Sequence, residues 1–421
     1  MNKKKFFYNK KNCRLCGSKK LNIFLNLKQS PIGDNYTQKK NKSQLIPLKL
    51  MNCRICNFKQ LSHVVDEKKV YGDYLYTTST SYGLKKHFKN SFNFLKNFHP
   101  NLSKNDYILD IGSNDGSNLE IFKSDKFKTI GIEPAKVLCR LSRKKKILTI
   151  NNFFNQKVSN LIKNRYGKPK IICIYNLLSN IDNLGSFFDN LNNLIDDETI
   201  ISIESFSLIG IVEKNLFDHI YHEHLSYFQI EPLIKFLKKY GLNILYSEYN
   251  QIKGSSMKIL IGKNLDLVNN KSINSCIRLE KKIRVNEISS FSKINKQNLK
   301  FTKDFNKKVK ILKINKLAGY GASCGSTTFI YNLSLNKKIN YFLDDEKIRN
   351  KLYSPHSNIQ VFNFNYDLIK KLDAILVVSW RYEKIIFKKF MHKIKLKKSK
   401  KNKQVYWIVP FPNLKIKKIR I

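Results

Sequence analysis

The sequence has no long apolar segment. Hydrophobic residues make up 42% of its 421 residues, which is enough for a buried core and too many for a disordered chain. Even so, no run approaches the roughly 18 apolar residues of a membrane-spanning helix. Residues 1–16 carry positive charge without the apolar core of a signal peptide. We therefore expect a cytoplasmic protein that does not insert into a membrane. Disulfides are rare in the cytoplasm, so its cysteines should be reduced or bind metal.

Acidic residues are scarce. Asp and Glu number 31 against 79 Lys and Arg, so the formal net charge is +48. Such basicity is typical of proteins that bind nucleic acids or anionic surfaces. Here the lysines are spread along the whole chain among Asn and Ile, which indicates a general composition bias rather than one binding face. We expect no nucleic-acid partner, although the charge should attract an anionic substrate such as a nucleotide diphosphate.

The chain also lacks an internal repeat of fixed short period, and its length predicts two or three domains. From about 107 to 262, strand-like and helical segments alternate, which predicts an α/β sheet covered by helices. A helical spacing of apolar residues over 81–98 precedes them, and a second α/β alternation begins near 316. The strand-like segments are 107–112, 129–133, 171–178, 198–205 and 255–262, and then 316–320, 339–345, 359–363, 374–380 and 405–409.

Four of the eight cysteines form two CxxC pairs, Cys13 with Cys16 and Cys53 with Cys56. A CxxC turn directs two thiolates at one metal, and two turns complete a tetrahedral site that suits Zn²⁺. With four thiolates the site has no open position, so the predicted zinc is structural. The alternative is four reduced cysteines in small cores. Zinc ribbons that bind nucleic acid share this spacing, so the cluster alone does not decide the function.

The segment 108–118 reads ILDIGSNDGSN and leads from a strand-like run into a helical one. Its two glycines allow a sharp turn and a close approach of a ligand to the backbone. The spacing differs from the GxGxxG of nicotinamide enzymes and is the variant common in S-adenosylmethionine-dependent methyltransferases. The alternative is a turn whose glycines serve packing alone. The predicted cofactor-loop residues are Asp110, Gly112, Asn114, Gly116 and Asn118.

Other strand ends add to the predicted cofactor site. The strand TIGIE ends at Glu133, well placed to accept hydrogen bonds from a ribose diol. Asn176 lies toward the end of the next predicted strand-like segment, 171–178, where a methyltransferase places residues beside the methyl group. Asn152 and Phe153 lie between them and could flank the adenine, although an ordinary turn and a core aromatic explain this pair equally well.

The segment 217–228, FDHIYHEHLSYF, holds three His, one Glu and two Tyr. A helical metalloprotease needs HExxH, and HEH fails on spacing. The cluster suits proton abstraction instead, because imidazole titrates near neutral pH and a nearby carboxylate or phenol can orient it. The alternative is a polar surface turn.

Together these motifs resemble the sugar C-methyltransferase family that acts on nucleotide-linked 4-keto-deoxysugars. The resemblance covers nearly the full length and rests on the CxxC pairs, YLYTTSTS at 74–81, LDIGSNDGSNL, GIEPA, NLLSNID, FDHIYHEHLSYF, KGSSMK and GYGASCGSTT. It implies a Rossmann-like class I methyltransferase domain at 76–265, which binds S-adenosylmethionine, between a zinc-binding lobe at 1–75 and a helical linker at 266–312. The last part, 313–421, would be a C-terminal Rossmann-like domain that helps to hold the sugar nucleotide.

The resemblance also implies a mechanism, the C-methylation of a nucleotide-diphosphate keto-sugar through an enolate, in deoxysugar or surface-polysaccharide biosynthesis. By resemblance, His224 and Tyr221 are the base candidates, Glu223 orients them or the sugar, and Tyr76 closes over the sugar. No metal takes part in this reaction. The sequence does not fix the oligomeric state, and a monomer is compatible with it.

Two positions depart from the family pattern. The family motif NxxxH has Asn180 where its His stands, and Asn can donate a hydrogen bond to an oxyanion but cannot transfer a proton. The family motif HGGS here reads KGSS at 253–256. Methyl transfer remains the prediction, with the sugar and the methylated carbon left open. The alternatives are a zinc-ribbon nucleic-acid methyltransferase, suggested by charge and CxxC pairs, and a non-catalytic sugar-nucleotide-binding protein, suggested by Asn180.

A second glycine-rich loop, GYGASCG at 319–325, follows a strand-like run. Its N–H groups and the adjoining helix N-terminus could hold a diphosphate, and packing explains the glycines about as well. Asp344 and Asp345 end the next strand, where a ribose or base could be bound. A second dinucleotide cofactor is the literal reading of the motif, but in the family that this chain resembles the domain serves the sugar nucleotide.

Overall fold

The computed structural model describes residues 6–71, 74, 76–99, 101–396 and 403–421. Leu75, within the stretch 74–81 noted above, lies outside the described residues. The chain divides into two compact units, each built from separate segments. Unit 1 comprises 1–24, 50–210 and 223–288, and unit 2 comprises 25–49, 211–222 and 289–421.

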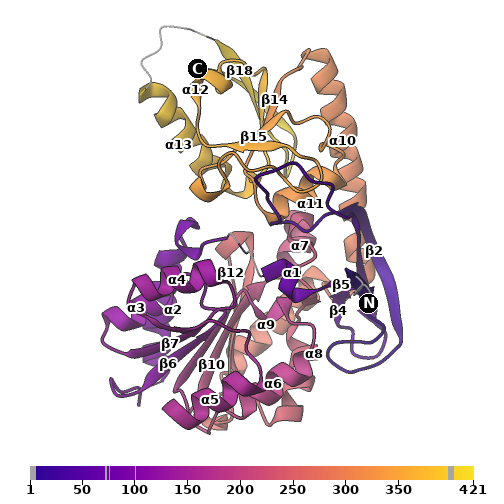
Figure 1. The fold of residues 1–421 in the computed structure, drawn as a ribbon. Coiled ribbons are helices and arrows are strands. Elements are labelled where there is room, and N and C mark those ends of the chain that lie inside the picture. The colour runs from indigo at the N-terminus through magenta and orange to yellow at the C-terminus, as the bar shows by residue number, and fades with distance from the viewer. Residues whose placement is uncertain (1–5, 72–73, 75, 100, 397–402) are drawn as a thin grey trace, which may run out of the picture. The chain divides into compact units, whose positions relative to one another are not determined.

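Among the described residues, the main sheet of unit 1 has seven strands in the order β12-β13-β10-β9-β6-β7-β8. Figure 1 labels β6, β7, β10 and β12 within it. Five are parallel, and β13 is antiparallel to both of its neighbours. This confirms the α/β prediction and its five strands, while β8 and β12 were not predicted. The bounds are β6 Tyr107–Ile111, β7 Lys128–Ile132, β8 Leu148–Ile150, β9 Ile171–Tyr175, β10 Ile200–Phe206, β12 Asn243–Asn250 and β13 Ser256–Gly262.

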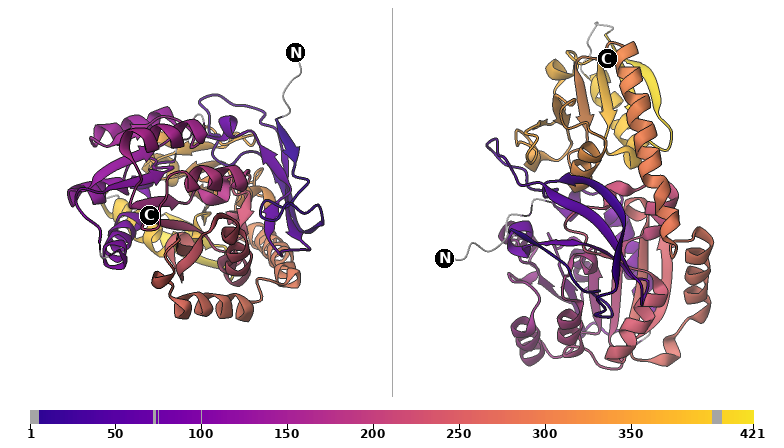
Figure 2. Two further views of the ribbon diagram at one scale, coloured as in Figure 1. Left: turned by 90° about the horizontal axis from the view of Figure 1, so that it is seen from below. Right: turned by 90° about the vertical axis from the view of Figure 1, so that its right-hand side faces the viewer.

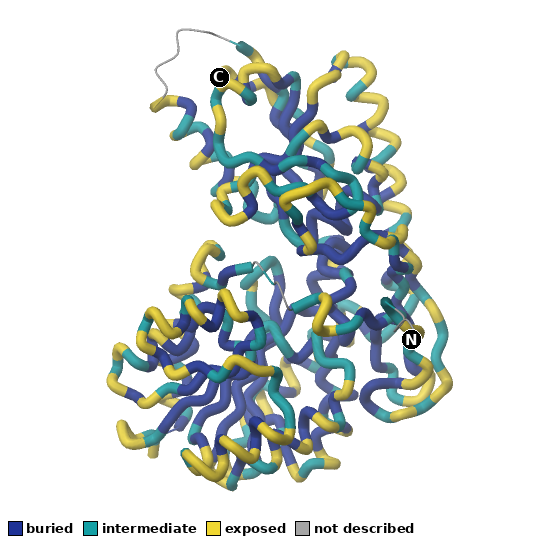
Figure 3. The backbone as a smooth tube through the Cα atoms, viewed as in Figure 1, coloured by how far each residue is buried: buried dark blue, intermediate teal, exposed yellow. Residues whose placement is uncertain are grey.

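Both faces of this sheet are covered by helices, because alternate side chains of each strand point to opposite faces. On β9, Ile171 and Cys173 pack toward α2 and α3, whereas Ile172 and Ile174 pack toward α5, α6 and α8. The sheet interior is accordingly buried along its length (Figure 3). The helices of unit 1 include α2 Leu84–Phe98, α3 Leu119–Ser124, α4 Lys136–Lys144, α5 Gln156–Tyr166, α6 Leu184–Asn192, α8 Ile230–Leu237 and α9 Asn270–Ile283.

The region around the cysteines is built from two small sheets. β1 (Phe7–Asn9) pairs with β5 (His63–Val65), and the helix α1 (Glu67–Tyr71) follows. A second sheet has the order β11-β4-β3-β2, with bounds Ser226–Tyr227, Lys59–Leu61, Ile46–Cys53 and Leu21–Ser30. The strands β2 and β3 contribute to both units, since the unit boundaries fall within them.

Unit 2 carries a six-stranded sheet in the order β16-β15-β14-β17-β18-β19, parallel except for the antiparallel edge strand β19. Trp407 on β18 is fully buried at its core. The helix α10 runs alongside this sheet (Figure 2). Among the described residues, none of the helices has the length and apolarity that crossing a bilayer demands.

The elements of unit 2 match the second predicted alternation. The strands are β14 Leu317–Tyr320, β15 Tyr341–Leu343, β16 Gln360–Phe362, β17 Ala374–Val377, β18 Gln404–Val409 and β19 Lys415–Arg420. The helices are α10 Ser292–Ile311, α11 Cys324–Asn332, α12 Tyr366–Ile369 and α13 Glu383–Leu396, and α7 (Leu208–Lys214) crosses a unit boundary.

The core of unit 1 predicts a stability effect at Phe188 on α6. This side chain is fully buried, and its ring centroid lies 5.1 Å from that of Phe236 and 5.4 Å from that of Tyr240. Phe188→Ala should lower the free energy of unfolding by about 3–5 kcal/mol, because a cavity remains. Leu161→Ala, at a side chain that is 47% exposed, should change it by less than about 0.5 kcal/mol. Denaturant titration followed by circular dichroism measures both, and equal midpoints would contradict this core.

Candidate active site

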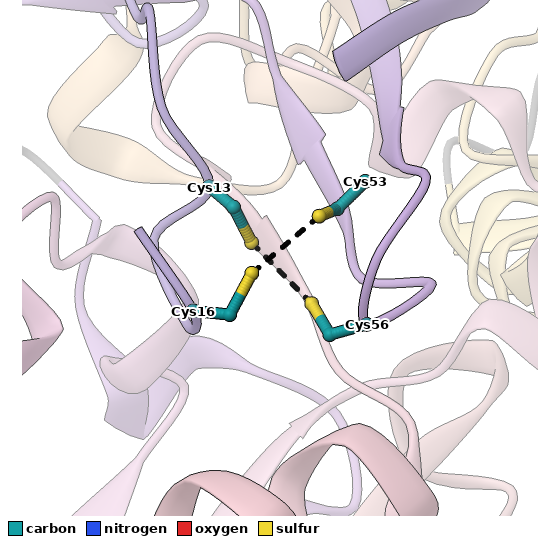
Figure 4. A group of neighbouring side chains, drawn as sticks. All are labelled: Cys13, Cys16, Cys53 and Cys56. Atoms are coloured by element: carbon teal, nitrogen blue, oxygen red, sulfur yellow. Dashed lines mark hydrogen bonds between the residues drawn. The ribbon is translucent and has the colours of Figure 1, made fainter. Parts of the chain in front are cut away.

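The four CxxC cysteines meet at one point (Figure 4). Their sulfur atoms all lie within 4.8 Å of one another, and the pairs Cys13–Cys56 and Cys16–Cys53 are each 3.5 Å apart. A tetrahedral site with zinc–sulfur bonds of about 2.3 Å needs sulfur–sulfur distances of about 3.8 Å, so the four thiols fit Zn²⁺ with little movement.

The two cysteine turns share one backbone geometry. In each, the residue after the second cysteine donates its N–H to the carbonyl of the first, Gly17 to Cys13 and Asn57 to Cys53, both at 2.9 Å. Both donors have a positive φ, 76° and 60°, which Gly and Asn tolerate best. The sequence therefore shapes two equivalent turns that direct four thiolates inward.

The cofactor loop lies where the strand order of the main sheet reverses. After β6 the chain continues to β7 and β8 on one side, while β9 and β10 lie on the other. In open α/β sheets, ligands bind in the crevice at such a reversal, outside the carboxyl ends of the strands. Asp110, Glu133 and Asn176 lie at the ends of β6, β7 and β9, so this topology brings the three predicted residues to one edge.

Within the loop, Gly112, Asn114 and Gly116 all have a positive φ of 77°, 52° and 75°. The side chain of Asn118 donates to Asp110 at 3.0 Å, and its Oδ1 is buried without a hydrogen-bond partner among the described residues. Such an unpaired acceptor is expected where a ligand supplies the missing donor.

Glu133 is the acid that the loop is built around. One carboxylate oxygen accepts from the N–H of Asn114 at 2.9 Å and the other from the N–H of Ala135 at 2.8 Å. Burial raises its pKa to about 7, against the effect of these two hydrogen bonds. Burial also raises the pKa of Asp110 to about 7. The edge thus holds two carboxyl groups that release protons near neutral pH.

Tyr76 is fastened to this loop. Its carbonyl accepts from the side-chain amide of Asn114 at 3.0 Å, and the N–H of Thr78 donates back to Asn114 Oδ1 at 2.9 Å. The Tyr76 hydroxyl lies 2.6 Å from Ser81 Oγ, and the ammonium of Lys253 lies 4.9 Å from the centre of the tyrosine ring. The stretch 74–81, the cofactor loop and the KGSS motif therefore meet, which no spacing in the sequence indicated.

The segment after β9 carries the two predicted asparagines. Asn176 has φ 56° and donates its N–H to the Glu204 carbonyl at 2.7 Å. The Asn180 side chain accepts from the Ser179 hydroxyl at 2.9 Å. The carboxylate of the same Glu204 lies 2.6 Å from His87 Nε2. Sequence reasoning missed this pair of a buried Glu and a partly buried His, because neither residue stands in a recognisable motif. Phe153, the predicted adenine neighbour, is partly buried.

The predicted catalytic segment is buried and divides between the units. Tyr221 belongs to unit 2 and is partly exposed, whereas Glu223 and His224 belong to unit 1 and are 3% and 8% exposed. The His224 ring stacks on Phe206, at the end of β10, with centroids 4.1 Å apart. Burial of so many polar groups disfavours a simple surface turn.

The second glycine-rich loop, in unit 2, is packed by its own chain. A Cβ at Gly325 would lie 2.7 Å from the Asp218 carbonyl, and one at Gly319 would lie 2.8 Å from the Phe342 ring. Asp344 accepts from the N–H groups of Ala322 and Glu346. Packing therefore accounts for Gly319 and Gly325, and internal hydrogen bonds account for Asp344.

Comparisons with known proteins match three consecutive parts of the chain to family models. These are a zinc binding domain at 13–71, a methyltransferase domain at 86–247 and a C-methyltransferase C-terminal domain at 251–412. The first contains all four clustered cysteines, and the second contains the cofactor loop and Glu133. The matches agree with the chemistry of both sites, zinc at the thiolates and S-adenosylmethionine at the carboxyl edge.

Individual relatives are more distant. The chain is similar to the C-methyltransferase NovU of Streptomyces niveus, 24% identical over 250 residues, and spans 59% of the length of that relative with 59% of its own. It is also similar to the solved structure of an S-adenosylmethionine-dependent methyltransferase from Anabaena variabilis, with 13% identity. The match covers 41% of this chain and 84% of the other, with a TM-score of 0.34. A magnesium protoporphyrin IX methyltransferase from Synechocystis, solved with S-adenosylhomocysteine, is 12% identical. That match covers 46% of this chain and 91% of the other, with a TM-score of 0.34.

Zinc content tests the cysteine cluster. We expect one zinc per chain in purified protein, and Cys53→Ser should lower the metal content and unfold the surrounding sheet, because metal binding energy is folding energy here. Cys139→Ser, at a buried cysteine outside the cluster, is the matched control and should keep the metal. Metal analysis that finds no zinc in the wild type, or an unchanged content in Cys53→Ser, would contradict the site.

The raised pKa of Glu133 predicts a pH dependence of cofactor binding. A ribose diol donates to an ionised carboxylate, so binding should release a proton and weaken as the pH falls below about 7. Glu133→Gln should lower the affinity at least about tenfold, the equivalent of 1.5–3 kcal/mol, and reduce the proton release. The exposed Glu120→Gln should do neither. Calorimetry in buffers of different ionisation enthalpy measures both quantities, and the absence of any proton release would refute the assignment.

The raised pKa of Glu133 also makes the unfolding free energy depend on pH. The unfolded chain ionises Glu133 near 4.5, whereas the folded chain ionises it near 7. Between these values the folded state binds more protons, so this group makes the unfolding free energy decrease as the pH rises through that interval. Glu133→Gln should remove this contribution from a pH series of denaturation midpoints.

Proposed function

We propose that this chain, three parts of which match models of a zinc binding domain, a methyltransferase domain and a C-methyltransferase C-terminal domain, is an S-adenosylmethionine-dependent C-methyltransferase that methylates a carbon next to the ketone of a nucleotide-linked 4-keto-deoxysugar. The family motifs support the keto-sugar as substrate, and the strongly positive charge favours a nucleotide diphosphate on it. The product would serve deoxysugar or surface-polysaccharide biosynthesis in the cytoplasm.

One observation carries the proposal. The N–H of Leu225, which follows His224, donates to the carbonyl of Ser179, which precedes Asn180, at 2.7 Å. This bond fixes the segment of the candidate base beside the segment that leaves the carboxyl end of β9, at the same edge as Glu133 and the cofactor loop. The bond supports the proposal that a proton acceptor and a hydrogen-bond donor lie next to the expected position of the methyl donor.

The chemistry needs a carbon nucleophile. When bound, S-adenosylmethionine supplies a sulfonium methyl group that such a nucleophile can take. A base removes the proton from the carbon beside the ketone, and the electron pair of that C–H bond forms the enolate. The enolate carbon then bonds to the methyl group, the C–S bond pair stays on sulfur, and the proton remains on the base until solvent removes it.

His224 is the proposed base, with Tyr221 as its alternative or partner and Glu223 as the orienting group. Stacking on Phe206 holds the imidazole in one plane, so that its ring nitrogens point within that plane. The surrounding burial excludes water, which strengthens the interaction of a base with the developing charge.

Asn180 is proposed to hold the enolate oxygen. Its Oδ1 accepts from Ser179 at 2.9 Å, which leaves Nδ2 as the group that donates. An N–H aimed at a developing oxyanion stabilises the transition state without transferring a proton. Tyr76, fixed to the cofactor loop through Asn114, is proposed to cover the sugar.

Base variants test the mechanism. In deuterated water without methyl donor, the acidic C–H of nucleoside-diphosphate 4-keto-deoxyhexoses should exchange in the presence of the enzyme. His224→Ala and Tyr221→Phe should each slow this exchange and the methyl transfer by about 10²–10⁴-fold, and Glu223→Gln should slow them less. If both base variants keep wild-type rates, measured by NMR for exchange and by mass spectrometry for methylation, the segment has a structural role only.

Asn180→His separates an enzyme from a binding protein. If Asn180 acts as a hydrogen-bond donor, restoring the family residue should change the methylation rate only modestly. If Asn180 has abolished methyl transfer, the wild type should bind cofactor and sugar nucleotide without turnover. In that case Asn180→His should restore methyl transfer. The rate of methyl transfer under single-turnover conditions distinguishes the two outcomes.

A further inference from the structure

The second residue of the first CxxC turn, Arg14, is buried inside unit 1. Its side chain is 0% exposed, and Nε donates to Asp182 Oδ1 at 2.9 Å. The same guanidinium donates through NH1 to the carbonyl of Leu61 at 3.1 Å. A guanidinium is not a ligand for Zn²⁺, so a zinc site alone gives no reason for a buried arginine between two of its ligands.

The partner of Arg14 lies on the segment that carries Asn180. Asp182 stands two residues after Asn180, and its carboxylate also accepts from the Tyr8 hydroxyl at 2.6 Å and the Lys10 ammonium at 3.0 Å. Although its burial acts in the opposite sense, Arg14, Tyr8 and Lys10 together hold the pKa of Asp182 below its usual value. This carboxylate is therefore ionised and held by three donors from the cysteine region.

The second acceptor of Arg14 leads to the segment of His224. The N–H of Leu61, whose carbonyl accepts from Arg14, donates to the carbonyl of Leu225 at 2.9 Å. The N–H of Leu225 in turn donates to Ser179 at 2.7 Å. Residues 179–182 connect Ser179 covalently to Asp182, and the Asp182 carboxylate accepts the hydrogen bond from Arg14.

These contacts form a closed ring, and we propose that Arg14 is a positioning residue that transmits the rigidity of the zinc-bound turn to the two segments that flank the reacting carbon. This inference rests on the proposed function for its catalytic meaning, since His224 and Asn180 adjoin the ring at Leu225 and Ser179. The metal holds the turn, the turn holds the guanidinium, and the guanidinium fixes the spacing between base and oxyanion donor.

The geometry requires arginine rather than any cation. Arg14 bonds two acceptors on different segments through Nε and NH1, and the planar fork of a guanidinium fixes the angle between those bonds. A lysine ammonium carries the same charge and could reach one acceptor, but it would not set the distance between the two segments. Arg14→Lys therefore separates positioning from charge.

Kinetics of four variants test the ring. Arg14→Lys, Arg14→Gln and Asp182→Asn should lower kcat for methyl transfer by about 10–100-fold, because small displacements of reacting groups have effects of this size. The zinc content and the dissociation constant of S-adenosylmethionine should stay near the wild-type values, since neither site includes Arg14 or Asp182. The double variant Arg14→Gln with Asp182→Asn should be no slower than either single one, because both remove the same interaction.

Asp125→Asn is the matched control. Asp125 is also a carboxylate held by two cations, Lys96 and Lys104, but it follows α3 at the surface of unit 1. The same isosteric change, carboxylate to amide, should leave kcat unchanged. It should also leave the exchange of backbone amide hydrogens unchanged. Wild-type kcat in both Arg14→Gln and Asp182→Asn, or fully additive losses in the double variant, would overturn the inference.

Amide hydrogen exchange gives a readout that does not depend on activity. In Arg14→Gln, exchange should become faster in peptides over 177–183 and 223–228 and stay unchanged in peptides over 112–118. If the wild type methylates no keto-sugar, the proposed function fails while this loosening still supports the ring. If the wild type is active and both peptides exchange as before in Arg14→Gln, the ring is wrong and the proposed function stands.

Discussion

A parallel sheet directs the carboxyl ends of its strands to one edge, and the candidate site depends on that constraint. β6, β7 and β9 deliver Asp110, Glu133 and Asn176 to a common edge although the residues are far apart in the sequence. The reversal of strand order between β6 and β9 opens this edge, because the connections on its two sides lead away from each other. Burial of two carboxyl groups there raises their pKa values to about 7, an unfavourable arrangement that a donor-rich ligand relieves.

The strands of the two sheets were predictable for a physical reason. Parallel strands covered on both faces form continuous apolar runs, and β6, β9 and β10 show such runs clearly. β8 has only three residues, and β12 carries Asn, Ser and Glu at the edge of the sheet, so neither gave that signal. The four cysteines were predicted as one cluster because the spacing of a metal site is itself a local pattern, and the family matches and their geometry confirm it.

Contacts between distant segments were not predictable. The hydrogen bond from Asn114 to Tyr76 joins residues 38 positions apart, and that from Arg14 to Asp182 joins residues 168 apart. No periodicity relates such positions, since they depend on how whole elements pack. The two glycine-rich loops show the same limit. In unit 1 the loop turns around a buried acid at a strand reversal, whereas in unit 2 a similar run of letters lets Gly325 pack against Asp218. Only the surroundings distinguish the two uses.

The way the chain is divided between its units has a practical consequence for the gene. Neither unit is encoded by one uninterrupted stretch, because residues 25–49 and 211–222 leave unit 1 to join unit 2. A fragment ending at 288 would still carry Phe217, whose ring packs in unit 2 against Phe329 and Phe411 at centroid distances of 5.9 Å. That ring would be left facing water, and the truncated product would tend to aggregate. An exchange of one unit for a homologous one must therefore replace several separate segments of the chain together.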